Sequence, residues 1–119
     1  MDPYTATVNA INSMAAAPRV HVHNNALQAA VDFILSLRVK KIPVPDVGPS
    51  PDGGVAMSWT FEGPRGDIEV DVVFLDWRRI EYREGFAARD GFLSDLVLDD
   101  EEDLRGRILK AWESAEQVV

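Results

Sequence analysis

Three runs in which every second residue is apolar, between residues 55 and 83, constrain the fold more than any other feature of the chain. A period of two is typical of a β-strand with one buried and one solvated face. The apolar positions are Val55, Met57, Trp59 and Phe61 in the first run, Ile68, Val70, Val72 and Phe74 in the second, and Ile80 and Tyr82 in the third. This pattern predicts a three-stranded antiparallel meander.

The register of these strands follows from keeping the apolar side chains on one face, because a slip of one residue would turn a strand over. A hairpin through residues 62–67 pairs Trp59 with Val70. A three-residue connection, 76–78, pairs Phe74 with Ile80, whereas a two-residue turn would mix apolar and polar residues on each face. The three-residue connection is therefore expected.

A helix is predicted between Asn25 and Val39, with Asn24 or Asn25 as its cap. Its polar residues recur every four positions and leave one narrow polar stripe, Gln28, Asp32, Ser36 and Lys40. A helix with so narrow a stripe is expected to be enclosed by protein on most sides. It is the predicted spine of the core.

Helices are also predicted at both ends of the chain. Asp99 and Glu102 have the spacing of a capping box, and apolar residues follow at helical intervals: Leu104, Ile108, Ala111, Trp112, Ala115 and Val119. At the other end, Asp2 before Pro3 is a favourable helix start. Residues 1–23 are therefore expected to form a weak helix or an N-terminal arm.

Two connections are less regular. Residues 41–54 hold four prolines and three glycines, so they are expected to be a polyproline-like connector. Its end, Asp52-Gly53-Gly54, is interpreted as a turn in which glycine supplies a positive φ. Residues 84–98 are compatible with a turn, a short helix or a fourth strand.

Together these elements predict one α+β domain over residues 1–119. A meander of three strands, or four, is covered on one face by the 25–39 helix and the C-terminal helix. The chain has no cysteine, so disulfides, zinc ribbons and thiol nucleophiles are excluded. The predicted core comprises Leu27, Val31, Ile34, Leu35, Trp59, Val70, Val72, Phe74, Leu104, Ile108 and Trp112.

The formal net charge of -8 is unevenly distributed. Residues 1–60 carry four acids and four bases, whereas residues 61–119 carry 16 acids and 8 bases. The excess disfavours direct binding to nucleic acid or to anionic membranes, and it permits a protein partner with a basic surface. There is neither a signal-peptide pattern nor an apolar run of the ~18 residues that a membrane span needs, so a cytoplasmic location is expected.

Seven acids and no base lie within one stretch: Asp90, Asp95, Asp99, Asp100, Glu101, Glu102 and Asp103. Acids at a helix N-terminus complement the helix dipole, so a solvated helix end is the simpler interpretation. Because a cap needs only one or two acids, the surplus motivates the hypothesis that this end binds a basic partner. Trp77, at a predicted turn tip, is a poor core candidate and a candidate contact residue.

Metal chemistry has only partial motifs. His21 and His23 would need two further ligands, and the chain has no other histidine or cysteine. Asp52 followed by Glu69 and Asp71 follows the outline of a PD…(D/E)xK nuclease, but Asp71 stands where the water-activating lysine is required. No catalytic residue, metal ligand or cofactor is predicted.

Asp67, Glu69 and Asp71 recur along one strand face, about 7 Å apart. They are expected to pair with Arg79 and Arg83 on the next strand. A small metal-dependent enzyme, or an accessory subunit of one, that uses these carboxylates is the alternative function.

Pro43, Pro45, Pro51-Asp52-Gly53-Gly54 and Trp59 form a P-x-P…P-x-x-DGG…W pattern between an apolar helix and an acidic hairpin. This pattern resembles a small family of bacterial and mobile-element proteins, although Asp76-Trp77 stands where such sequences often have Asp-Gly. The resemblance implies a prokaryotic or phage origin and transfers no catalytic residue. The predicted function is a non-enzymatic acidic protein-binding module, such as an anti-defence inhibitor of the anti-CRISPR type or an antitoxin.

Overall fold

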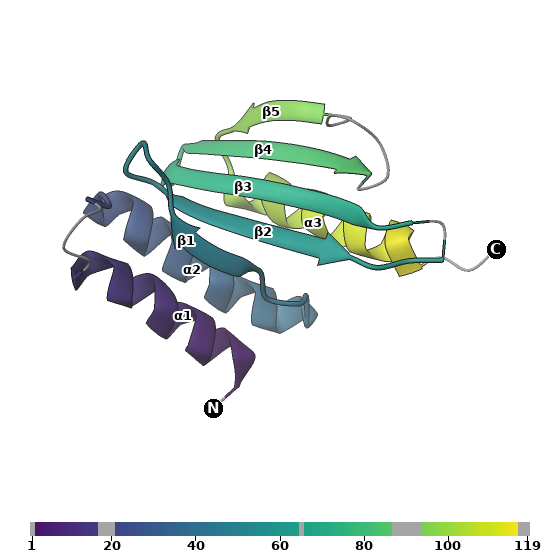
Figure 1. The fold of residues 1–119 in the computed structure, drawn as a ribbon, viewed down its shortest axis with the longest axis horizontal. Helices are drawn as coiled ribbons and strands as arrows, with labels where there is room; N and C mark the ends of the chain where they lie inside the picture. Colours follow the sequence, from purple (N-terminus) through teal and green to yellow (C-terminus); the bar gives the residue numbers. More distant parts are fainter. Residues whose placement is uncertain (1, 17–20, 65, 87–93, 117–119) are drawn as a thin grey trace.

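The computed structural model describes residues 2–16, 21–64, 66–86 and 94–116. Five strands form one antiparallel sheet in the order β1-β2-β3-β4-β5, so strands adjacent in sequence are adjacent in space (Figure 1). The fold is α+β with an antiparallel sheet, as predicted. The elements are α1 (Pro3–Ser13), a 3-10 turn (Met14–Ala16), α2 (Asn24–Lys40), β1 (Asp46–Pro49), β2 (Val55–Phe61), β3 (Ile68–Asp76), β4 (Arg79–Phe86), β5 (Ser94–Leu98) and α3 (Glu101–Glu116).

The core lies between one face of the sheet and the helices α2 and α3, while α1 packs beside α2 and β1 (Figure 1). Burial alternates along β2 and β3 with the predicted period of two. Phe33 of α2 is fully buried, and its ring centre lies 5.3 Å from that of Phe74 and 6.5 Å from that of Trp59. These rings join α2 to the inner face of the sheet.

The predicted register is confirmed, because Trp59 pairs with Val70 and Phe74 with Ile80. The connection between β3 and β4 differs from the prediction. The ladder shifts between Phe74 and Asp76, so that one extra residue in β3 forms a bulge and a two-residue turn follows. The turn is closed by the Arg78 backbone N–H, which donates to the Asp76 carboxylate at 2.7 Å.

The prediction of three or four strands was too low. Residues 94–98 form β5 on β4, which is the fourth strand considered for residues 84–98. The strand that was not predicted is β1, in the 41–54 connector, which pairs with β2. Pro49 is tolerated because an edge strand leaves its missing N–H facing away from the ladder. The Asp52-Gly53-Gly54 turn is confirmed: Gly53 has φ 86°, and its N–H donates to the Ser50 carbonyl at 3.0 Å.

Of the three predicted helix N-caps, only that of α1 is confirmed. Asp2 caps α1 as predicted, because its carboxylate accepts the Thr5 N–H at 2.9 Å. The asparagine cap of α2 was wrong: His23 occupies the cap position without a side-chain hydrogen bond. Asp100, rather than Asp99, caps α3 by accepting the Glu102 N–H at 2.9 Å.

The predicted core is mostly confirmed, with one rotation error on α2. Leu35 is 44% exposed, whereas Phe33, which was left out, is completely buried. Val31 and Trp112 are only partly buried and pack against the core. The apolar arc of α2 is therefore wider than the surface that covers it.

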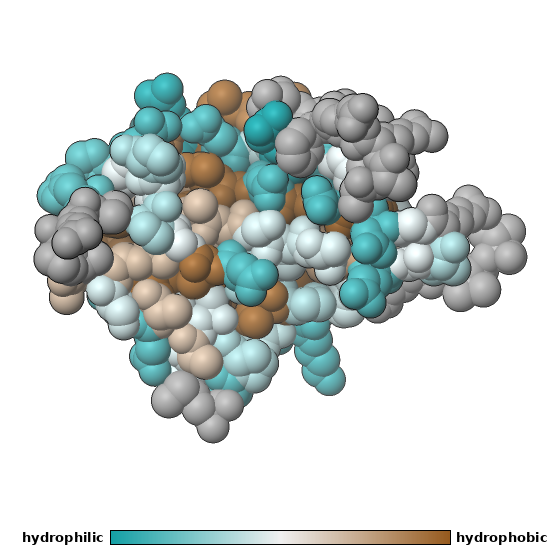
Figure 2. Space-filling model, in the orientation of Figure 1, coloured by the Kyte–Doolittle hydropathy of each residue, from teal (hydrophilic) through white to brown (hydrophobic). Residues whose placement is uncertain are grey.

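The outer face of the sheet has no helix over it in the part of the chain that the structure describes (Figure 1). Hydrophobic and hydrophilic residues are interspersed on this side of the molecule (Figure 2). Val97 of β5 is 70% exposed there. Among the described residues, no helix has the length and apolar character to cross a bilayer.

Candidate functional site

The acids between residues 99 and 103 lie at one end of the molecule, beside the turn between β3 and β4. Leu98, the last residue of β5, pairs with Ile80 near the start of β4, and α3 begins directly afterwards (Figure 1). The side chains of Asp99, Asp100, Glu102 and Asp103 are exposed there. Asp90 lies outside the described residues, and for Asp95 the structure gives its place in β5, opposite Arg83.

Contacts within the protein already use part of this negative charge. Besides the cap at Asp100, Asp103 Oδ1 lies 3.2 Å from Arg107 Nε. Glu101 lies 3.9 Å from Arg105. The side-chain carboxylates of Asp99 and Glu102 have no hydrogen bond or ion pair with other described residues. The surplus of acids available to a partner is therefore smaller than the sequence suggests.

Trp77 lies on the same end of the molecule. The residue is 40% exposed, and its indole N–H donates to Asp32 Oδ2 of α2 at 3.3 Å. One turn further along α2, the Ser36 hydroxyl accepts a hydrogen bond from Arg105 of α3 at 2.9 Å. The polar stripe of α2 thus connects the β3–β4 turn to α3. We call Trp77, Asp32, Asp99, Asp100, Glu102 and Asp103 the tryptophan–acid surface.

The motifs considered for metal binding remain separate. Asp71, on the outer face of β3, accepts the Ser58 hydroxyl at 2.8 Å and lies opposite Arg83. The rings of His21 and His23 meet edge to face at 5.2 Å. Within the described segments, no three histidine or carboxylate side chains are grouped so that they could hold a metal ion.

A hollow of about 410 Å³ opens where β2 extends beyond the start of β1. Asp46 and Glu62 line it together with Trp59 and Trp112, and none of the described residues that line it is a base. The inner indole is fixed, because Trp59 Nε1 donates to the Pro43 carbonyl at 2.8 Å. Carboxylates beside aromatic rings favour a cationic group.

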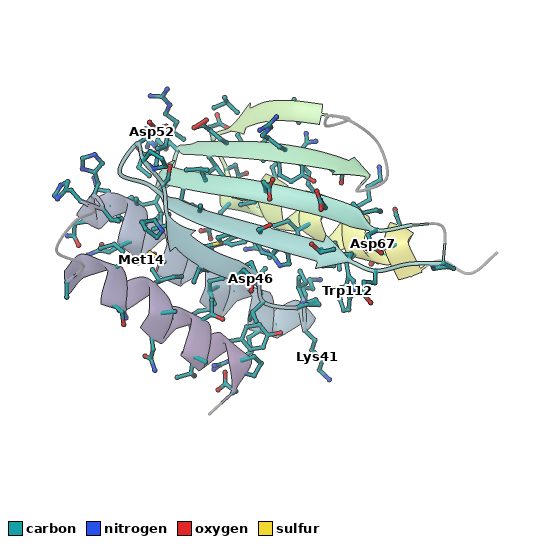
Figure 3. All side chains as sticks on the ribbon, in the orientation of Figure 1. Met14, Lys41, Asp46, Asp52, Asp67 and Trp112 are labelled. Atoms are coloured by element: carbon teal, nitrogen blue, oxygen red, sulfur yellow. The ribbon has the colours of Figure 1, made fainter. Side chains whose placement is uncertain are left out.

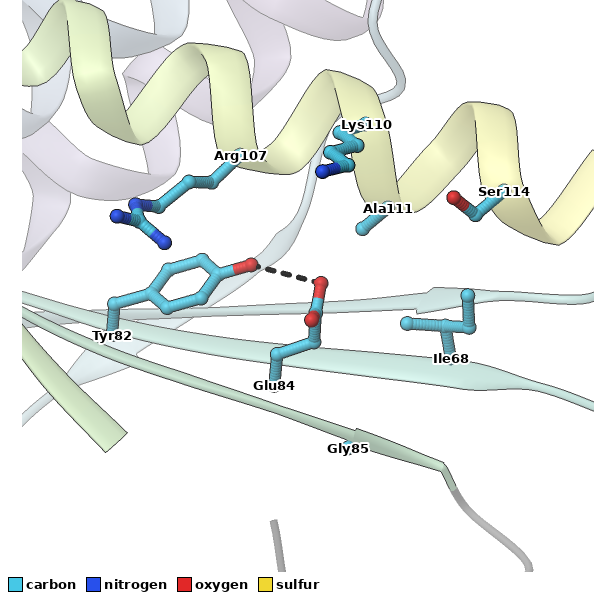
Figure 4. A pocket seen from close by; sticks show the side chains of 8 residues that line it. All are labelled: Ile68, Tyr82, Glu84, Gly85, Arg107, Lys110, Ala111 and Ser114. Atoms are coloured by element: carbon cyan, nitrogen blue, oxygen red, sulfur yellow. Dashed lines mark hydrogen bonds between the residues drawn. The ribbon is translucent and has the colours of Figure 1, made fainter. Parts of the chain in front are cut away.

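A cavity of about 240 Å³ between β4 and α3, lined by both charged and apolar residues, was not predicted from the sequence (Figure 4). Tyr82 is 1% exposed, and its hydroxyl donates to Glu84 Oε1 at 3.1 Å. The Arg107 guanidinium lies 6.0 Å from the centre of the Tyr82 ring. The residues that line the cavity are Ile68, Tyr82, Glu84, Gly85, Arg107, Lys110, Ala111 and Ser114.

The environment keeps Tyr82 protonated. Burial, and then the negative charge of Glu84, raise the pKa of Tyr82 above its usual value. The phenol therefore remains a hydrogen-bond donor to the carboxylate at any physiological pH. The signal for this site was present in the sequence: Glu84 follows Tyr82 by two residues and so shares the inner face, where it pairs with Val70. The predicted strand ended at Arg83 and left Glu84 out.

A polar side chain on an otherwise apolar inner face is more informative than an exposed one. Figure 3 shows the described side chains on the ribbon, and the close-up in Figure 4 shows that Glu84 points toward α3. Comparisons of the chain with protein-family models, with curated proteins and with solved structures found no match. The geometry of these sites is therefore the basis for inferring a function.

Proposed function

We propose that this protein is a non-enzymatic recognition module that binds a basic surface of a protein partner through the tryptophan–acid surface. The observation that carries the proposal is the position of Trp77, a 40% exposed indole held against Asp32 beside the acidic start of α3. Exposed tryptophans are enriched among the residues that dominate the energy of protein interfaces. Acids around such an anchor favour a basic partner.

The anchor is pre-organised, which lowers the entropic penalty of binding. The two-residue turn that carries Trp77 is closed by the Arg78–Asp76 hydrogen bond. The indole of Trp77 is hydrogen-bonded to Asp32 of α2. The carboxylates of Asp99 and Glu102 have no partner among the described residues, so a partner's lysine or arginine can approach them without displacing an internal contact.

The charge distribution supports the same class of partner. Residues 61–119, which supply most of the tryptophan–acid surface, hold 16 acids against 8 bases. The hollow at Asp46 and Glu62 adds a second place suited to a cation. A basic protein face that otherwise contacts nucleic acid would match these features, and an inhibitor of the antitoxin or anti-defence type would act by covering it.

The proposal can be tested by photocrosslinking in the native host. A photoreactive phenylalanine analogue at position 77 should capture a basic protein that the same analogue at Glu113, exposed near the far end of α3, does not. With the captured protein purified, Trp77→Ala should weaken binding about 30-fold, which corresponds to the roughly 2 kcal/mol lost at an interface hot spot.

Charge reversal provides the second arm of the test. The double variant Asp99→Lys/Glu102→Lys should weaken binding and reduce its dependence on salt, because fewer charges attract the partner. Glu113→Lys is the matched control and should bind like the wild type. Wild-type affinity of both the Trp77→Ala protein and the double variant would refute the proposal, as would capture of an acidic protein.

A further inference from the structure

The cavity between β4 and α3 has walls of opposite charge. Glu84 rises from the sheet, and Lys110 and Arg107 descend from the helix (Figure 4). Arg107 forms an ion pair with Asp103, which is outside the cavity lining, at 3.2 Å. Part of the positive charge of Arg107 is therefore already neutralised. Lys110 is the cation of the cavity wall that has no ion pair with any described residue.

Glu84 and Ser114 line the cavity and can each form further hydrogen bonds. Glu84 uses Oε1 to accept the Tyr82 hydroxyl, and a carboxylate can accept several more hydrogen bonds through its other oxygen. The Ser114 hydroxyl has no hydrogen-bond partner in the described parts of the chain. Lys110 and Ser114 are four residues apart on α3, so they lie on the same side of the helix.

The size and the remaining lining restrict what could bind. Ile68, Ala111 and Gly85 give the cavity an apolar part next to its charged groups. Its volume of about 240 Å³ is below the roughly 300–1,000 Å³ of pockets that take drug-sized ligands. The occupant should therefore be a small molecule with a short apolar portion.

We propose that this cavity binds a compact zwitterion of the size and charge of a free α-amino acid. Glu84 would bind its ammonium group, Lys110 and Ser114 its carboxylate, and Ile68 and Ala111 would contact its side chain. This site is separate from the tryptophan–acid surface and does not depend on the function proposed for that surface.

The other charge classes fit the cavity less well. An anion would meet the Glu84 carboxylate, which Tyr82 holds in place by its hydrogen bond. A cation would meet Lys110 and Arg107. A neutral apolar molecule would displace water from Glu84 and Lys110 without replacing the hydrogen bonds of that water. The loss of hydration is unfavourable for a charged group. A zwitterion pairs with both walls at once.

The test is a binding screen of the full chain against the twenty L-α-amino acids, each added singly at millimolar concentration, by ¹H–¹⁵N NMR. At least one should shift the amides of Ala111 and Ser114 in a saturable way. For that amino acid, its carboxamide, which lacks the carboxylate, and its N-acetyl form, which lacks the ammonium, should each bind at least tenfold more weakly.

Matched variants connect the binding to the two walls. Lys110→Met and Glu84→Gln should each weaken binding at least tenfold, whereas Lys40→Met and Glu113→Gln, both at exposed positions outside the cavity, should leave it unchanged. Lys110 is exposed, so its variant keeps the test valid if Glu84→Gln unfolds the protein. Failure of all twenty amino acids to bind, or equal binding of the N-acetyl form, would overturn the proposal.

Discussion

Truncation of Phe33 to alanine should destabilise the protein far more than truncation of Leu35, two residues further along the same helix. Phe33 is fully buried, with its ring against Phe74 and Trp59. Removal of such a ring leaves a cavity that the surroundings fill only in part, and the loss of unfolding free energy should be about 3–5 kcal/mol.

Leu35 is 44% exposed, so slightly more than half of its side chain is removed from water. Complete burial of a leucine contributes about 1.5–3 kcal/mol, so Leu35→Ala should lower the unfolding free energy by about 1 kcal/mol. No enclosed cavity forms, because the vacated space is open to solvent. The two variants should therefore differ by at least about 2 kcal/mol.

Urea unfolding at 25 °C, followed by far-UV circular dichroism, measures this difference. With an m-value of about 1–3 kcal/mol/M, the midpoint of Phe33→Ala should lie roughly 0.7 M or more below that of Leu35→Ala. Val39→Ala is the control, since Val39 is 82% exposed and its truncation should change stability little. Equal effects of the Phe33 and Leu35 truncations would refute the rotation of α2 described above.

Three further predictions follow from other contacts. A Cβ at Gly63 would overlap the Ala115 carbonyl oxygen, so Gly63→Ala should reduce the unfolding free energy by about 1–3 kcal/mol, measured in urea. Because the pKa of Tyr82 is raised, its contribution to stability is complete below about pH 10 and lost as pH rises further, and absorbance at 295 nm should show one tyrosine that ionises late. The Thr5 backbone N–H lowers the pKa of Asp2, so this cap stabilises α1 above about pH 4 and is lost as pH falls through the lowered pKa; hydrogen exchange in α1 should then accelerate.

Each of these predictions has a control. Gly48→Ala should be close to neutral, because a Cβ there meets no atom within 4 Å. The late component of the tyrosine titration should disappear in Tyr82→Phe. If this component persisted in the variant, the late ionisation would not belong to Tyr82. The acid-induced exchange in α1 should be absent in Asp2→Ala, which lacks the titrating cap at every pH. Unchanged acid sensitivity in that variant would contradict the assignment to Asp2.

The sheet register could be predicted because its physical cause is local. Trp59, Val70, Phe74 and Ile80 must share the buried face, and only one pairing of each hairpin achieves this. The predicted pairing of β3 with β4 is correct although the predicted turn is not. The bulge in β3 and the two-residue turn after it give the same pairing as the predicted three-residue loop. Burial, rather than turn length, set the register.

The remaining errors concern contacts between segments distant in sequence. The proline-rich stretch contains β1 because β2 offers it an edge to pair with, which no local propensity reveals. Asp32 lies in the predicted polar stripe of α2, and it accepts a hydrogen bond from Trp77 because the β3–β4 turn reaches α2. Part of the acidic run was correctly interpreted as a helix start, yet Asp99 is not its cap.

By itself, the sequence determined the class of fold, the inner face of the three central strands and the acidic character of the second half of the chain. These depend on the period of the side chains and on composition, both of which are local. Only the tertiary structure decided that Phe33 faces the core instead of Leu35, and that Glu84 and Lys110 line one cavity. Such arrangements depend on how α2 and α3 pack on the sheet, and packing is a property of surfaces brought together from distant parts of the chain.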